Sequence, residues 1–255
     1  MSKRKSIISF LLFLSSTNFA IAADSDGFKR PLDQIQFNSD SNQNIFEQAN
    51  IKALNVYDPL ESINRQIYNF NAYVDNNFLF PVVKGYRYIT PDFVEHRVHN
   101  FLGNIDDFTN LFNSTLQLNT HRSLVITARL LFNSTIGLLG LWDPASLMGL
   151  PKQKEDFGQT LGFYGVPAGP YLVLPLFGPS NFRDSVGLIT DFEAEGSVDF
   201  LKFASFNFDY PEFTALWLID TRSSINFNYG QFNSPFEYEK VRYFFQEARR
   251  LQIVE

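Results

Sequence analysis

The sequence predicts a mostly helical domain, all-α in class, behind an N-terminal leader. Apolar residues recur at spacings of three and four along several segments, as on one face of a helix. Helix-start signals, in which a polar residue precedes a proline and an acidic residue, stand before some of these segments. Strand-like alternation of apolar and polar residues is scarce. We therefore expect one helical domain over residues 55–255.

The N-terminal segment has the pattern of a cleaved secretory signal peptide, residues 1–22. Basic residues (3–5) precede a short apolar run (7–14), and small residues occupy the cleavage positions (20–22). The apolar run is shorter than the roughly 20 residues that a transmembrane helix needs. We expect export, cleavage before Ala23, and a flexible polar leader over residues 23–54.

The apolar spacing predicts helices over five segments: 58–74, 91–112, 121–135, 211–223 and 235–251. Asp58-Pro59-Leu60-Glu61 has the form of a capping box, so the first helix is expected to begin there. The second helix contains Gly103, where we expect a break.

A long uncharged stretch raises a different expectation. From Phe157 to Phe182 there is no charged residue, yet glycine and proline interrupt the stretch throughout. Irregular backbone exposed to hydrocarbon leaves unpaired polar groups, each costing several kcal/mol. The stretch therefore predicts a bent hairpin or broken helices packed among other helices, with a cavity on one side. Its expected turn and hinge positions are Gly162, Gly165, Gly169 and Pro170.

Residues for catalysis, metal binding or nucleic-acid binding are not prominent. A net charge of −6 argues against contact with a phosphate backbone. His96 and His99 share a helical face beside Glu95 but lack a third ligand at suitable spacing. The adjacent carboxylates at 106 and 107 diverge by about 100° on a helix, so we interpret them as a solvated face. We expect no catalytic residue, metal or cofactor.

Charged residues at the edges of apolar segments leave two interpretations open. Asp143 follows the apolar run "GLLGLW", and Arg183-Asp184 follows the uncharged stretch. Asp143 is interpreted first as an N-cap, and Arg183 as a stem that covers apolar surface with its head in water. The alternative places Asp143, Arg183 and Asp184 at the rim of a lipid-lined cavity.

Three blocks of the sequence carry a resemblance to a known family. They are "YDPLESINRQIYNFN" (57–71), "RLLFNSTIGLLGLWDPA" (129–145) and "FGQTLGFYGVPAGPYLVLPLFGPSNFRD" (157–184). Together, and in this order, they resemble the MlaA (VacJ) family of Gram-negative outer membranes. The similarity covers roughly residues 55 to 250.

The resemblance implies an all-helical, ring-shaped protein within the outer membrane, beside a trimeric porin. It implies non-enzymatic removal of misplaced phospholipid from the outer leaflet, which maintains lipid asymmetry. The lipid would pass to the periplasmic lipid carrier of the Mla pathway and then to an inner-membrane transporter driven by ATP. By position, a hairpin lining a central channel would correspond to Leu161 through Phe177. The expected channel residues are Leu161, Phe163, Tyr164, Val166, Tyr171, Val173, Leu174, Leu176 and Phe177.

Membrane attachment is expected to differ from the family pattern. Family members are usually lipoproteins, whereas this chain has Ala-Ile-Ala-Ala (20–23) where a lipobox cysteine would stand. One acyl chain supplies about 5–6 kcal/mol of membrane binding. Burying Phe78, Leu79 and Phe80, at about 1.5–3 kcal/mol each, would supply a comparable amount. We therefore expect these three residues to face the membrane.

Two alternatives belong to other functional classes. The first is a secreted phospholipase or lipid-modifying enzyme, which would need a nucleophile near one of the histidines at 96, 99 and 121. The second is a structural porin-binding protein without transport.

Overall fold

The computed structural model describes residues 56–197, 211–232, 234 and 236–254, which belong to one compact unit. The expected signal peptide (1–22) and leader (23–54) lie outside the described residues. The elements are α4 (Glu61–Val74), the π-helix η1 (Asp75–Leu79), α5 (Phe80–Ile89), α6 (Asp92–Leu116), α7 (Thr120–Thr135), α8 (Pro144–Leu147), α9 (Phe157–Phe163), β1 (Tyr171–Leu174), β2 (Gly178–Asn181), α10 (Phe182–Ser197), α11 (Pro211–Ser224) and α12 (Glu237–Val254). The mostly helical class is confirmed, and the ring shape stays a prediction.

All five expected helices are present, but two local predictions were wrong. Helix α4 begins at Glu61 with Leu60 at its N-cap and no capping side chain, because Asp58 instead binds Tyr238 and Arg242 of α12. Helix α6 continues through Gly103 without a break. One glycine costs a helix only about 1 kcal/mol, which the packing of a long helix easily offsets.

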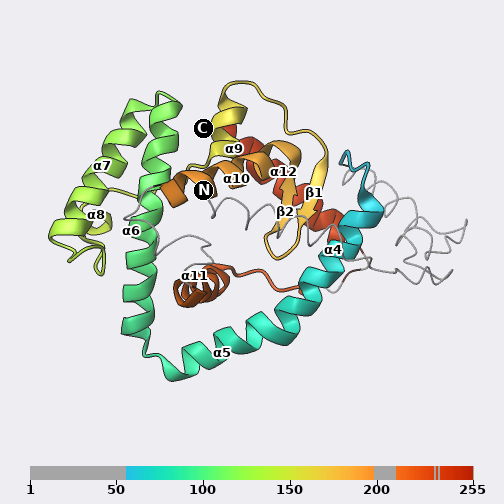
Figure 1. Cartoon of the computed structure of the whole chain (residues 1–255), viewed down its shortest axis with the longest axis horizontal. Coiled ribbons are helices and arrows are strands. Elements are labelled where there is room, and N and C mark those ends of the chain that lie inside the picture. Colours follow the sequence, from blue (N-terminus) through green and yellow to red (C-terminus); the bar gives the residue numbers. More distant parts are fainter. Residues whose placement is uncertain (1–55, 198–210, 233, 235, 255) are drawn as a thin grey trace, which may run out of the picture. The chain divides into compact units, whose positions relative to one another are not determined.

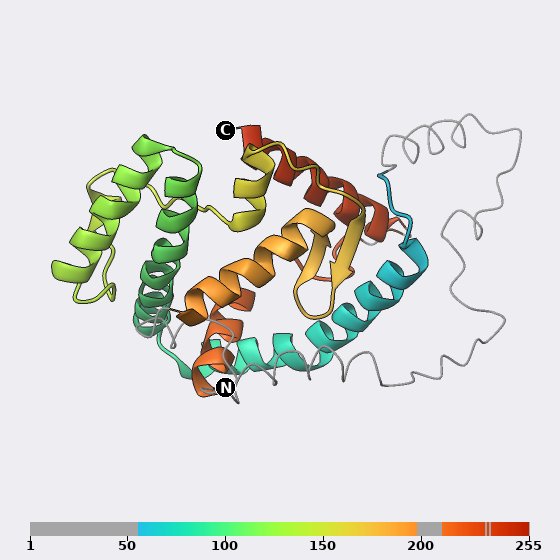
Figure 2. The same ribbon diagram turned by 45° about the horizontal axis from the view of Figure 1, so that its top comes forward.

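The uncharged stretch is a helix followed by a β-hairpin. Helix α9 takes up its first part, and β1 and β2 pair as an antiparallel two-stranded sheet with Tyr171 opposite Asn181. The hairpin therefore spans residues 171–181 rather than 161–177. Figures 1 and 2 show it beside α10, with α4 along its other side.

Helices α9 and α10 cross in close contact, and glycines make this possible. A Cβ atom built on Gly187 of α10 would lie 2.4 Å from the backbone nitrogen of Gly158 in α9. A Cβ atom on Gly162 would lie 2.7 Å from the side chain of Ile253 in α12. The glycines that make this stretch a poor helix former thus let α9 pack against α10 and α12.

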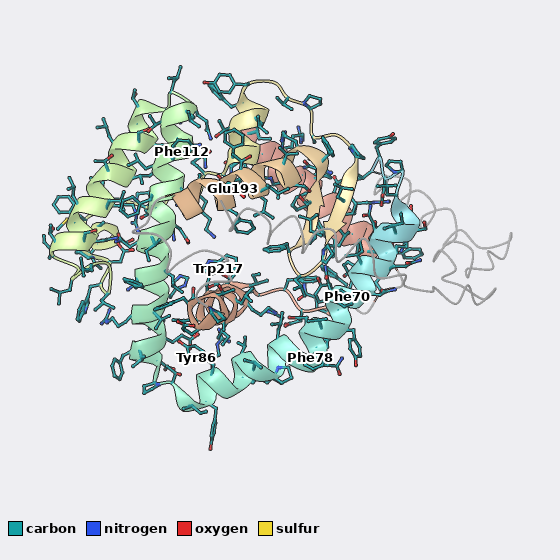
Figure 3. The ribbon with its side chains drawn as sticks, viewed as in Figure 1. Phe70, Phe78, Tyr86, Phe112, Glu193 and Trp217 are labelled. Atoms are coloured by element: carbon teal, nitrogen blue, oxygen red, sulfur yellow. The ribbon has the colours of Figure 1, made fainter. Side chains whose placement is uncertain are left out.

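The burial pattern is the reverse of that in an ordinary soluble protein. Among the described residues, 10 hydrophobic side chains are buried, against 23 polar or charged ones, while 35 large hydrophobic side chains are exposed. Helix α4 illustrates this, since Asn64 and Asn71 are buried while Ile63 and Phe70 are 52% and 47% exposed. Figure 3 draws these side chains and labels Phe70 on α4 and Phe78 on η1. So much exposed apolar surface indicates contact with lipid or with another protein.

Candidate functional site

An apolar cavity of about 430 Å³ opens beside the hairpin turn. Leu176, Phe177 and Gly178 line it from the turn, and Leu79 lines it from η1. The remaining wall comes from α4, the start of η1, β2, the end of α11, the segment after α11, and α12: Tyr68, Asn71, Val74, Asp75, Pro179, Arg222, Ile225, Phe227, Tyr229, Phe232, Val241, Phe244 and Phe245. Most of these side chains are aliphatic or aromatic, so the cavity suits an apolar guest.

One buried ion pair stands in the wall of this cavity. The Arg222 guanidinium donates from Nε to Asp75 Oδ1 (2.5 Å) and from Nη2 to Asp75 Oδ2 (2.9 Å). Arg222 also donates to the Ile225 carbonyl and to Asn228. Asp75 is buried in the single π-helical turn between α4 and α5. The two charges neutralise each other, so the cavity carries little net charge.

Two asparagines of α4 hold the hairpin beside the cavity. Asn64 accepts from the Val173 amide (2.9 Å) and donates to the Tyr171 carbonyl (3.0 Å). Seven residues further on, Asn71 accepts from the Leu176 amide (2.8 Å) and donates to the Leu174 carbonyl (2.9 Å). Each side-chain amide thus satisfies one backbone donor and one acceptor of the hairpin, much as a third strand would.

The structure separates the expected channel residues into three groups. Only Leu176 and Phe177 line the cavity. Tyr171 and Val173 are 0% and 2% exposed and belong to a core cluster with Tyr68 and Tyr238. The rest are half-buried or exposed on α9, the loop after it, or β1: Leu161, Phe163, Tyr164, Val166 and Leu174. The Tyr164 hydroxyl donates to the Leu116 carbonyl (2.6 Å). The role of these residues in a channel stays a prediction.

The expected turn glycines either adopt a positive φ or permit a close approach of another chain segment. Gly165 and Gly169 have φ of +84° and +71°, the left-handed region that favours glycine. Gly162 lies inside α9, where it permits the close approach of Ile253. Pro170 immediately precedes β1 and accepts a hydrogen bond from the Phe182 amide.

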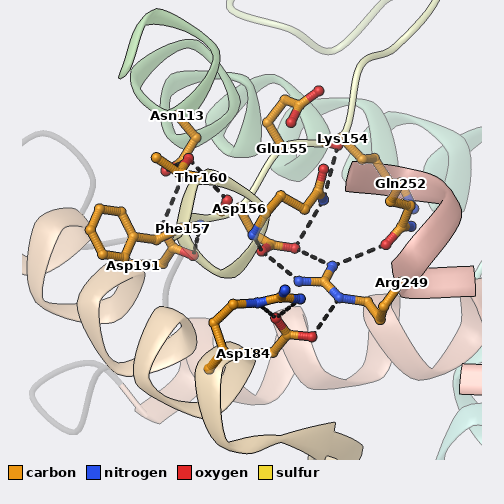
Figure 4. Close-up of polar contacts among 12 residues, drawn as sticks. Asn113, Lys154, Glu155, Asp156, Phe157, Thr160, Asp184, Asp191, Arg249 and Gln252 are labelled. Atoms are coloured by element: carbon orange, nitrogen blue, oxygen red, sulfur yellow. Dashed lines mark hydrogen bonds and ion pairs between the residues drawn. The ribbon is translucent and has the colours of Figure 1, made fainter. Parts of the chain in front are cut away.

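Arg183 and Asp184 lie in a buried ionic cluster rather than at an open rim. Arg183 and Asp184 are 6% and 9% exposed, and their side chains are 2.7 Å apart. Arg249 of α12 binds both Asp184 and Asp156, and so ties α12 to α10 and to the start of α9 (Figure 4). Burial raises the pKa of the Asp156 carboxyl, but the hydrogen bonds and positive charge of Arg249, together with the hydrogen bonds from Gln159, outweigh that effect and hold its pKa below the usual range.

Asp143 is an N-cap, as first interpreted, and belongs to a second buried network. Its side chain accepts from the Ser146 amide at the start of α8. It also accepts from Arg129 (3.1 Å) and Asn133 (3.0 Å) of α7. The same Arg129 binds Asp107, which is 0% exposed, so the solvated-face interpretation was wrong for Asp107. Spacing on one helix could not show that the partner lies on the next.

The three residues expected to face the membrane differ in their surroundings. Phe78 is 58% exposed, as a lipid contact requires. Leu79 is half-buried in the cavity wall. Phe80 is also half-buried, beneath the Lys84 ammonium and the Arg222 guanidinium at 4.3 Å and 5.6 Å. Of these three residues, only Phe78 is exposed enough to face the membrane as expected.

The contacts of His99 bear on the alternative that the protein is an enzyme, because a hydrolase would need a histidine beside a serine and a carboxylate. Its Nδ1 lies 3.0 Å from Asp220 Oδ2 and 3.4 Å from Ser224 Oγ, both in α11, a helix that also carries Trp217 (Figure 3). A hydrolase relay needs the serine and the carboxylate on opposite ring nitrogens. Here both share one nitrogen, so the contacts describe a helix-to-helix clamp. Among the described residues, no group of three potential metal ligands exists.

The fold and the cavity define a class: a helical protein that buries many polar side chains, exposes many large apolar ones, and has an apolar cavity beside a hairpin. Within the described part of the chain, no helix combines the length and hydrophobicity needed to cross a membrane. The MlaA lipoprotein family model matches residues 56–252, so the chain belongs to the MlaA lipoprotein family.

Individual relatives agree with this membership. An uncharacterised protein of Rickettsia felis is 45% identical over 131 residues, covering 51% of this chain and 52% of that protein. The intermembrane phospholipid transport system lipoprotein MlaA of Escherichia coli (strain K12) is 36% identical over 138 residues, covering 52% of this chain and 55% of that protein. The chain spans about half the length of the curated relatives it matches.

A solved structure extends the similarity. It is described as the structural basis for maintenance of bacterial outer membrane lipid asymmetry, and its sequence is 28% identical to this chain. The TM-score is 0.66, and the match covers 78% of this chain and all of the other.

Proposed function

We propose that this protein transports phospholipid without enzymatic chemistry, removing misplaced phospholipid from the outer leaflet of the outer membrane. The observation that carries the proposal is the apolar cavity beside the hairpin turn, in a molecule that exposes 35 large hydrophobic side chains among its described residues. Its volume falls within the roughly 300–1,000 Å³ of typical small-molecule sites, and its lining suits an acyl chain better than a polar ligand. The relatives' names, which refer to intermembrane phospholipid transport, support the same substrate.

The proposal includes a location and partners. The protein lies in the outer membrane, held there by exposed apolar side chains such as Phe78. It receives phospholipid beside a trimeric porin and delivers it to the periplasmic carrier of the Mla pathway. Export by a signal peptide and attachment without an acyl chain belong to the same proposal.

A charge placed in the cavity wall tests this function. Leu176→Asp brings a carboxylate to the turn, where facing hydrocarbon unpaired costs several kcal/mol. The substitution does not strain the backbone further, because aspartate tolerates the left-handed φ of +68° better than leucine does. The control is Leu251→Asp, at a position on α12 that is 57% exposed and lies outside the cavity lining.

The readout is outer-leaflet phosphatidylethanolamine, labelled on intact cells by an amine reagent that does not cross membranes and normalised to protein level. We expect Leu176→Asp to raise this lipid to the level of cells without the gene, while Leu251→Asp keeps it low. If Leu176→Asp and Phe244→Asp both behave as the wild type, the cavity is not the lipid path. Retained porin co-purification with lost asymmetry would argue against a scaffold without transport.

A further inference from the structure

The loop between α7 and α8 presents leucines in a backbone conformation that leucine avoids. We call residues 136–142, Ile-Gly-Leu-Leu-Gly-Leu-Trp, the leucine tip. Leu138 and Leu139 have φ of +50° and +59°, where the Cβ of an L-residue crowds the following carbonyl. Their side chains are 58% and 67% exposed, and that of Ile136 is 61% exposed. These two leucines are not needed for core packing, because they are exposed, and glycine would adopt this backbone conformation more easily.

A buried polar network fixes this turn from below. Asn133, 3% exposed, accepts from the Ala145 amide (3.1 Å) and donates to Asp143 (3.0 Å). Its backbone carbonyl accepts from the Gly140 amide (2.8 Å). A Cβ atom on Gly137 would lie 2.4 Å from that same carbonyl, so the chain passes too closely for any other residue. The surrounding structure holds the strained leucines outward, and strain held in this way marks functional positions.

The leucine tip is uncharged and has an arginine at its base, as expected for a segment that enters a lipid surface. From Leu130 to Trp142 there is no charged residue, and the Asp143 carboxylate turns inward to Arg129. The cation beside the tip is Arg97, whose guanidinium lies 4.5 Å from the centre of the Trp142 ring. Tryptophan and arginine at the base of an apolar projection are typical of the membrane interface, where the ring sits at headgroup depth and the guanidinium reaches phosphate.

We propose that the leucine tip inserts into a phospholipid bilayer, with Leu138 and Leu139 among the acyl chains and Arg97 at the phosphate level. Leu147 at the end of α8 and Met148 at its C-cap extend the inserted surface, and they are 90% and 53% exposed. The proposal rests on the proposed membrane location and not on lipid transport. The tip thereby anchors the α7–α8 side of the protein to the membrane independently of Phe78.

The chain offers a single-tryptophan reporter for this insertion. It contains two tryptophans, so Trp217→Phe leaves Trp142 as the only one. The full-length protein is reconstituted into phosphatidylethanolamine–phosphatidylglycerol vesicles with and without brominated acyl chains. We expect brominated chains to quench Trp142 fluorescence. Adding Leu138→Asn and Leu139→Asn should cut that quenching about twofold or more, because two apolar groups leave the acyl region.

Folding stability separates insertion from a structural role. Asparagine adopts the left-handed conformation more readily than leucine, so the double variant should unfold at the same temperature or a higher one. Leu251→Asn, at a position on α12 that is 57% exposed, is the control and should leave quenching unchanged.

Three results would overturn the proposal: no quenching in protein that still partitions into vesicles, unchanged quenching in the double variant, or a lower unfolding temperature of that variant. Shielding of Trp142 from aqueous iodide only when a porin is added would assign the tip to a protein partner instead. Failure of the wild type to bind vesicles at all would overturn the membrane location itself.

Discussion

The asparagine clamp on the hairpin yields a prediction whose size follows from the structure. Asn64→Ala removes three hydrogen bonds, to Asp58, to the Tyr171 carbonyl and from the Val173 amide. A net hydrogen bond contributes about 0.5–1.5 kcal/mol, and a buried group left unpaired costs about 1–3 kcal/mol. Since Asn64 is 2% exposed, we expect a loss of about 2–4 kcal/mol in the free energy of unfolding.

Asn71→Ala removes two hydrogen bonds closer to solvent, so its expected loss is smaller, about 1–3 kcal/mol. Denaturant unfolding in detergent micelles measures both losses. Asn69→Ala, an exposed position on the same helix, is the control and should stay within about 0.5 kcal/mol of the wild type.

Hydrogen exchange identifies which contact was lost. In Asn64→Ala the Val173 amide should exchange faster, because its acceptor is gone, while the Leu176 amide keeps its protection. In Asn71→Ala the order is reversed. If each variant deprotects both amides equally, or neither, then the two asparagines do not act as separate clamps and the reasoning fails.

Three further predictions concern helix packing and pH. Gly187→Ala should cost about 1–3 kcal/mol of unfolding free energy, because its Cβ meets backbone of α9 at 2.4 Å. The matched Gly85→Ala meets nothing within 4 Å and should stabilise by about 0.5–1 kcal/mol, and equal losses would refute the close-contact account. The hydrogen bond to Asp220 raises the pKa of His99, so this clamp contributes full stability below about pH 6.5 and loses it as pH rises through the raised value. His99→Gln should flatten stability over that window in denaturant titrations, and an unchanged slope would contradict the clamp. The pKa of Asp156 is lowered, so its contribution is full above about pH 4 and lost as pH falls. Asp156→Asn should lower the free energy of unfolding at neutral pH and should weaken its fall with pH below about pH 4. If the free energy of unfolding of the variant falls with acid as steeply as that of the wild type, Asp156 does not contribute to the acid sensitivity.

The helix positions could be read from the sequence because the apolar period is local information. The period could not say which face points inward. On α4 the apolar positions Ile63 and Phe70 face outward, and the polar positions Asn64 and Asn71 bind the hairpin. The rule that the apolar face of a helix points to the core holds for a protein surrounded by water. Where the surroundings are lipid, an apolar face no longer needs to point inward.

The ionic clusters were missed for a different reason. Asp107 and Arg129 are 22 residues apart, and Asp156 and Arg249 are 93 residues apart. No spacing rule connects such pairs, and each carboxylate alone resembles an ordinary surface residue. One signal was available, a charged residue at the edge of an apolar run: Asp143 proved to cap α8, and Arg183 proved to be buried.

We propose above all that this protein clears phospholipid from the outer leaflet. The most direct measurement is the amount of outer-leaflet phosphatidylethanolamine in cells with the gene, without it, and with it restored. We expect this amount to rise when the gene is removed and to return to the original level when the wild-type chain is supplied, with total phospholipid unchanged. Outer-leaflet phospholipid that stays the same in all three strains would contradict the claim.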